Sequence, residues 1–314
     1  MTKQIFRVRN WGEYNKALVN RGSITLWFPE NFEKNWCYRS PVKLRGGQKK
    51  YSDMAITLCL IFRGKYGLTL RETQGFVQSI FDMKQMDLNC PDYTSICRRA
   101  QEIDIEIPRS VVHGSIDVVF DSTGFKIYGE GEWKVRQHGY SKRRTWVKLH
   151  IGVNPKDHTI VAEEVTSNSV TDDKVFSRLL EQIPHTINST PLDGAYDKKG
   201  CYIAAHNKGA IPIVPPRKDA VISNDPDLVE RNFAITYIKK HGGGEEGRKM
   251  WKIASGYHKR SIAETAMFRL KQLFSDRLKS RKFLNQTAEL KVRIAILNKM
   301  TLHGMPDSYC VANN

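Results

Sequence analysis

Three short helices are predicted near the start of the chain from the spacing of its apolar residues. They cover 52–67, 69–81 and 91–103, and Gly-Leu or Asn-Cys-Pro steps separate them. Thr69 and Glu72 have the spacing of a capping box that opens the second helix. Such a trio suits a helix-turn-helix-like module that lays its last helix in the major groove of DNA, and it is also common in plain helical bundles.

The apolar pattern changes period at about residue 113, where β-branched and aromatic residues begin to alternate with charged ones. We expect strands here, then a helix, a strand, a helix and a short strand. The first strands are expected at 113–123, at 126–136 and at 144–154 followed by 159–167. A helix at 172–183, a strand at 189–197, a helix at 200–209 and a short strand at 210–216 come next. This order predicts an α/β fold, a ribonuclease H-like mixed sheet with flanking helices.

A polar stretch follows Pro216 and is predicted to be an insertion of about 217–250, with a helix at 227–240 and a glycine loop at 241–247. An amphipathic helix from about Tyr257 to Leu278 and a last helix at 287–302 follow.

The predicted domains are therefore three. A helical N-terminal DNA-binding region covers 1–110, with the helix-turn-helix-like part at about 52–103. The catalytic domain covers 111–300, and a tail covers 301–314.

The net charge of the chain indicates which class of partner it binds. It has 50 Lys and Arg against 33 Asp and Glu, a net charge of +17, which favours a polyanion such as nucleic acid. No apolar run approaches the roughly 18 residues that cross a bilayer, so we expect a cytoplasmic or nucleoid location and no membrane. The six cysteines include no Cys-x-x-Cys pair, which argues against a zinc finger.

Three acidic residues are candidates for catalysis. Asp121 and Asp193 are each expected at the carboxyl end of a strand, the edge where ligands gather in open sheets. Glu264 lies on the predicted helix after 257, where Tyr257, Arg260, Glu264 and Lys271 fall on one face. Two Asp and one Glu could hold two divalent ions for phosphodiester hydrolysis, with Mg²⁺ expected and Mn²⁺ as its substitute.

Each of these residues also has an ordinary explanation. An Asp after a strand is often a turn former, and a lone helical Glu is usually a solvated surface residue. Arg260 could form a plain i, i+4 salt bridge with Glu264, whereas the catalytic hypothesis assigns Arg260 and Lys271 to phosphates beside the metals. The combination of acids and cations favours the catalytic hypothesis.

The run Tyr257-x2-Arg260-x3-Glu264-x6-Lys271 resembles the C-terminal signature of bacterial insertion-sequence DDE transposases, in the group named after insertion sequence five. The resemblance covers roughly 40–300 and includes DSTGFKIYGEGEW, LDGAYD and PPRK. It implies a transposase that binds inverted-repeat ends, cleaves them and joins the freed 3′ ends to target DNA. It also implies Asp121, Asp193 and Glu264 as the metal-binding triad.

The remaining candidates are DNA contacts. Arg98 and Arg99 end the third helix, Trp133 and Lys134 lie in a predicted hairpin, and Arg217 and Lys218 follow Pro216. The expected partner is double-stranded DNA, bound as a homodimer or higher oligomer. The alternatives are another ribonuclease H-like nuclease, or a transposase-derived regulator that binds DNA without cutting it.

Overall fold

The computed structural model describes residues 5–38, 49–111, 114–127 and 146–311. The chain divides into two compact units, one of Met1–Pro108 with Lys282–Asn314 and the other of Arg109–Arg281. Trp133, Lys134 and most of the strand expected at 126–136 lie outside the described residues. In the described part, no helix combines the length and apolar character that crossing a bilayer requires.

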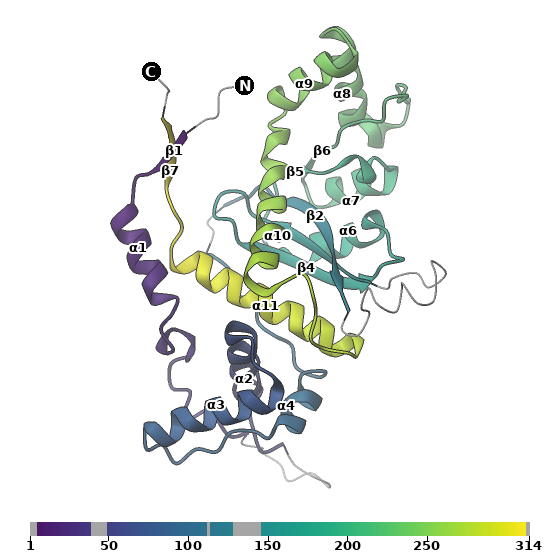
Figure 1. Ribbon diagram of the computed structural model, residues 1–314. Helices are drawn as coiled ribbons and strands as arrows, with labels where there is room; N and C mark the ends of the chain where they lie inside the picture. Colours follow the sequence, from purple (N-terminus) through teal and green to yellow (C-terminus); the bar gives the residue numbers. More distant parts are fainter. Residues whose placement is uncertain (1–4, 39–48, 112–113, 128–145, 312–314) are drawn as a thin grey trace, which may run out of the picture. The chain divides into compact units, whose positions relative to one another are not determined.

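Three helices of the first unit form close to the ranges expected from the apolar spacing, and only the second of them extends beyond its range, by two residues (Figure 1). They are α2 (Asp53–Tyr66), α3 (Leu70–Met83) and α4 (Tyr93–Arg99). The predicted capping box is confirmed, because Thr69 accepts from the Glu72 N–H while the Glu72 carboxylate accepts from the Thr69 N–H at 2.6 Å. The shorter α1 (Trp11–Asn20) and a 3-10 turn, η1 (Thr25–Trp27), precede them.

The C-terminal helix α11 (Phe283–His303) also belongs to the first unit. It packs against α2 at Gly64, where a Cβ atom would lie only 3.0 Å from Ile296 and 3.1 Å from Val292. This differs from the sequence-based division, which assigned residues up to 300 to the catalytic domain. The spacing of apolar residues in α11 shows that one face of the helix is buried, but it does not show against which unit that face packs.

The last residues form a strand where a tail had been expected at 301–314. The strand β7 (Ser308–Val311) pairs antiparallel with β1 (Ile5–Val8). Arg9 N–H donates to Asp307 O at 2.7 Å just beyond the ladder. The two ends of the described chain are thereby joined within the first unit.

The second unit contains a mixed sheet. Strands β2 (Val119–Lys126), β3 (Trp146–Val153) and β4 (Ile160–Ser167) pair antiparallel in that order. Strands β5 (Ser189–Pro191) and β6 (Ile211–Ile213) pair in parallel. A parallel bridge from Ile116 to Ile187 and a bond from Val118 N–H to Ser189 O connect the two sets. The predicted mixed α/β architecture is confirmed, with three strands, a helix, a strand, a helix and a strand in that order.

The two faces of β2 contact different helices. Phe120 points into the core formed with α6 (Asp172–Glu181) and α7 (Lys199–Asn207), where it meets Phe176 edge-on. Because side chains alternate along a strand, Asp121 and Thr123 point to the opposite face. That face receives the helix α10 (Ser261–Phe274), which contacts both β2 and β3.

A helical pair follows β6, after a 3-10 turn η3 (Pro226–Leu228). The helix α8 (Val229–Lys240) lies within its expected range, but α9 (Gly244–Ala254) begins inside the segment expected to be a glycine loop. Gly242, Gly243 and Gly244 all have positive φ and form the turn that leads into α9. A Cβ atom on Gly247 would lie 2.2 Å from Ile238 O, so this glycine permits α8 and α9 to approach closely.

The single helix expected from Tyr257 to Leu278 is in fact two elements. A 3-10 turn, η4 (Tyr257–Arg260), leads into α10, which ends at Phe274. Ser275 adopts a φ of 68°, and the chain beyond it turns to pair with β2. Lys126 N–H donates to Asp276 O, and Leu278 N–H donates to Lys126 O, each at 2.8 Å. These strand-like bonds replace the last helical turn.

Candidate active site

Asp121 is the third residue of β2, directly opposite Ile151 of β3. The sequence had suggested that the strand ends at Asp121, but it continues to Lys126 because the pairing with β3 runs through the Ser-Thr-Gly segment. The side chain is 18% exposed, and its Oδ1 accepts the Ser122 N–H at 2.8 Å. Asp121 therefore lies on the rigid, paired part of the strand.

Asp193 lies two residues beyond the end of β5, as expected for an acid at a strand terminus. It caps a 3-10 turn, η2 (Gly194–Tyr196), because its Oδ1 accepts the Ala195 N–H at 2.8 Å. Its side chain is half-buried. This turn fixes the direction in which the carboxylate leaves the sheet.

Arg260 joins the other two candidate acids. Its Nη1 lies 3.4 Å from Asp121 Oδ2, and its Nη2 donates to Glu264 Oε1 one helical turn further on. Asp121 is 139 positions earlier in the chain than Arg260. The Glu264 side chain remains 55% exposed. The arrangement exceeds the plain i, i+4 salt bridge, because the same guanidinium contacts a second, distant carboxylate.

The electrostatics of Asp121 reflect crowding of carboxylates. Burial raises the pKa of Asp121, and the nearby Asp193 and Glu264 carboxylates add to this increase. The Ser122 N–H and the Arg260 guanidinium oppose it. The charges of both other acids of the candidate triad therefore act on the Asp121 carboxylate. Among the described residues, however, no three acidic, His or Cys side chains are close enough together to hold a metal ion.

Lys271 and Tyr257 lie at opposite ends of the signature. Lys271 Nζ donates to Thr123 Oγ1 at 2.5 Å, two residues beyond Asp121 on the same face of β2. Tyr257 packs against Trp251 of α9, with ring centroids 5.6 Å apart, and burial raises the pKa of its hydroxyl. Lys271 therefore lies along the same strand as Asp121, whereas Tyr257 connects the site to the α8–α9 pair.

The other expected DNA contacts differ in exposure. Arg98, Arg217 and Lys218 are exposed. Arg99 is only 7% exposed, and its guanidinium donates to Tyr51 O at 3.0 Å and to the Asp53 carboxylate. We therefore withdraw Arg99 as a DNA contact. Arg99 joins the end of α4 to the start of α2. Its position next to Arg98 in the sequence gave no sign that its side chain is buried.

A buried polar cluster behind Asp121 was missed by the sequence analysis. Asp172, the first residue of α6, has its Oδ1 2.7 Å from Lys148 Nζ and 3.0 Å from His150 Nδ1. His150 is fully buried, and its Nε2 lies 2.9 Å from Thr166 Oγ1. Burial alone would raise the pKa of Asp172, but hydrogen bonds from His150, Lys148 and Ser122 hold it well below its usual range. These residues come from β2, β3, β4 and α6, so only the tertiary fold brings them together.

We predict that Asp172→Asn lowers the free energy of unfolding by about 1 to 3 kcal/mol at pH 7, the usual worth of hydrogen bonds to a charged group. The folded-state pKa is depressed, so this stability is present above the unfolded pKa of about 3.9 and is lost as pH falls below it. Urea unfolding at several pH values should show the difference from wild type shrinking toward pH 3. The exposed Asp219→Asn is the control, and a difference independent of pH would contradict the assignment.

Comparisons with known proteins show the family of this chain. Two family models, both described as a transposase DDE domain, match residues 19–130 and 113–299. A solved structure of the piggyBac transposase synaptic complex with hairpin DNA is also similar, at 9% identity and a TM-score of 0.45. That match covers 91% of this chain and 74% of that one. Since the second family model alone spans more than half of the chain, this protein belongs to the family of transposases with a DDE domain.

Proposed function

We propose that this protein is a DNA transposase of the insertion-sequence-five group, with a ribonuclease H-like catalytic domain. It binds the inverted-repeat ends of its element, cleaves the DNA by two-metal hydrolysis and transfers the 3′ ends to target DNA. The observation that carries the proposal is the contact of Arg260 with both Asp121 and Glu264. The order of strands and helices around β2 supports the proposed fold.

Asp121, Asp193 and Glu264 would hold the divalent ions, Mg²⁺ with Mn²⁺ as a substitute. Their chemistry fits, since hard cations prefer carboxylate oxygens. Among the described residues, Asp193 and Glu264 each keep one oxygen without a hydrogen-bond partner, and Asp121 Oδ2 has only the 3.4 Å contact to Arg260. Bound metal would activate the attacking oxygen and stabilise the leaving one. Burial and like charge around Asp121 favour its binding a cation.

The cations of the signature act on the DNA strand. The fork of Arg260 suits two oxygens of one phosphate, and in the protein alone it is held by carboxylates of the candidate triad. Lys271 supplies a point charge beside Thr123 on the same strand face. In this proposal both side chains orient a phosphodiester over Asp121, and Tyr257, which packs against Trp251 of α9, supports Arg260.

The partner is double-stranded DNA, both the element's ends and the target, bound by a homodimer or higher oligomer in the bacterial nucleoid. The net charge of +17 and the exposed Arg98, Arg217 and Lys218 support a polyanionic partner. We assign end recognition to the helices α2 to α4. Trp133 and Lys134 remain proposed contacts from the sequence. A regulator derived from a transposase would bind the same DNA without cutting it.

Metal removal tests this function. We expect the purified protein to cut a duplex that carries the element's end only with Mg²⁺ or Mn²⁺, and to lose cleavage in EDTA while still retarding the duplex in a gel. Adding Mg²⁺ back should restore the cut strands. Retardation without cleavage in either metal would support the regulator. Cleavage that persists in EDTA would contradict the two-metal proposal.

A further inference from the structure

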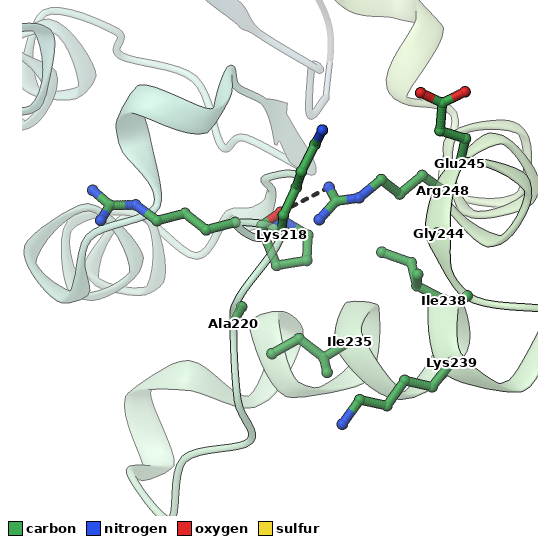
Figure 2. A pocket seen from close by; sticks show the side chains of 11 residues that line it. Lys218, Ala220, Ile235, Ile238, Lys239, Gly244, Glu245 and Arg248 are labelled. Carbon is green, nitrogen blue, oxygen red and sulfur yellow. Dashed lines mark hydrogen bonds between the residues drawn. The ribbon is translucent and has the colours of Figure 1, made fainter.

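A pocket of about 270 Å³ lies between the segment after β6 and the helices α8 and α9 (Figure 2). Its apolar lining includes Pro216, Ile235 and Ile238, which are all buried. Gly243, just before α9, and Gly244, its first residue, also line the pocket. The pocket is therefore formed by an ordered part of the second unit and has an apolar floor.

Four cationic side chains line the same pocket, namely Arg217, Lys218, Lys239 and Arg248. Among the described residues, none of them forms an ion pair with a carboxylate. The dashed line in Figure 2 marks the one hydrogen bond drawn there, from Arg248 Nη1 to Pro216 O at 2.8 Å. Glu245 is the one acid in the lining, and its carboxylate points away from the two isoleucines (Figure 2). The lining thus carries an excess of three positive charges.

We propose that this pocket binds one nucleotide unit, with its phosphate on the cations and its base on the isoleucine floor. A phosphate of intact duplex needs no apolar floor, whereas a base removed from the stack buries an apolar face. The volume of about 270 Å³ lies just below the range of ligand pockets, which begins at about 300 Å³, so the pocket has room for one nucleotide at most. Cations that have no carboxylate partner within the described part of the chain, set around an apolar floor, are the chemistry that recognises a nucleoside phosphate.

The nucleotide has two sources, a free mononucleotide or an unpaired position in a DNA strand. The second source rests on the proposed function, and the packing favours it. Ile238 of the pocket lies in one buried cluster with Trp251, and Tyr257 of the signature packs against that cluster. An occupied pocket would therefore support the segment that carries Arg260.

The test measures binding of thymidine 5′-monophosphate to the whole protein, without metal, by ligand-observed NMR. We expect Lys218→Gln and Lys239→Gln each to weaken binding by about tenfold, the loss of one charge-assisted contact. Thymidine, which lacks the phosphate, should bind at least about tenfold more weakly. Ala220→Phe should block the pocket without changing charge. Lys240→Gln and Lys249→Gln remove exposed cations of α8 and α9 outside the lining and should leave binding unchanged.

A single-stranded oligonucleotide separates the two sources. If the pocket takes a nucleotide of DNA, the oligonucleotide should displace the monophosphate, and Lys239→Gln should weaken its binding more than Lys240→Gln does. If the oligonucleotide does not displace it, the ligand is a free nucleotide. Equal effects of the lining variants and their controls, or no binding of the monophosphate, would overturn the proposal. Because this assay involves no cleavage, its failure would leave the proposed transposase activity standing.

Discussion

Asp121→Asn, Asp193→Asn and Glu264→Gln are each expected to lower Mg²⁺-dependent strand cleavage by at least about 100-fold, the cost of losing one electrostatic contact to a transition state. These changes keep side-chain shape. An asparagine at 121 or 193 can still accept the backbone N–H that holds the aspartate. The loss would therefore report on charge at the site and not on folding. Cleavage of a labelled duplex in single-turnover conditions measures it.

Binding of the same duplex should change little in these variants, since removing a carboxylate removes no phosphate contact. Asp276→Asn is the matched control, because Asp276 pairs with Lys126 at 2.7 Å at the other end of β2. It should cleave at the wild-type rate. If any one of the three acidic positions tolerates its amide with normal cleavage, that residue does not belong to the metal site.

Arg260→Lys is expected to lower cleavage by about 100-fold, with a smaller loss of binding. Lysine keeps the charge but cannot place two N–H groups on one phosphate, and small errors of positioning at a reacting centre have effects of this size. Arg260 also contacts Asp121 and Glu264 in the protein alone, so the variant alters how the acids are held before DNA binds.

Arg178→Lys provides the comparison, because Arg178 makes an exposed pair with Glu164 through Nε and Nη2 and lies on α6. An ordinary exposed salt bridge is worth about 0.2 to 1 kcal/mol, so this control should retain its cleavage. Arg260→Lys with wild-type cleavage would show that Arg260 forms a salt bridge alone and has no place in the reaction.

Much of the secondary structure could be predicted from the sequence because it depends on local spacing. The period of the apolar residues predicts α2, α3 and α8 closely, and the Thr69 box forms as expected. The Arg260 to Glu264 contact also follows from helical spacing. Local rules suffice wherever the partner lies within one helical turn.

Long-range pairing could not be predicted in this way. The strand β2 extends past Asp121 only because β3 pairs with it, and α10 ends early because residues 276–278 pair with Lys126. The cluster of Asp172 and His150 depends on the packing of α6 against β3. Arg99 has the sequence context of an exposed DNA contact, yet its partner is Asp53, 46 positions earlier. Such contacts are decided by the tertiary fold.

The division of the chain also has a consequence for synthesis on the ribosome. The second unit is one continuous segment, whereas the first needs residues 282–314 to supply α11 and β7. At about 5 to 20 residues per second, synthesis of the second unit takes about 9 to 35 s, and α11 can cover α2 only after that time. During that time the apolar surface around Gly64 stays open. That uncovered surface of α2 is then open to aggregation.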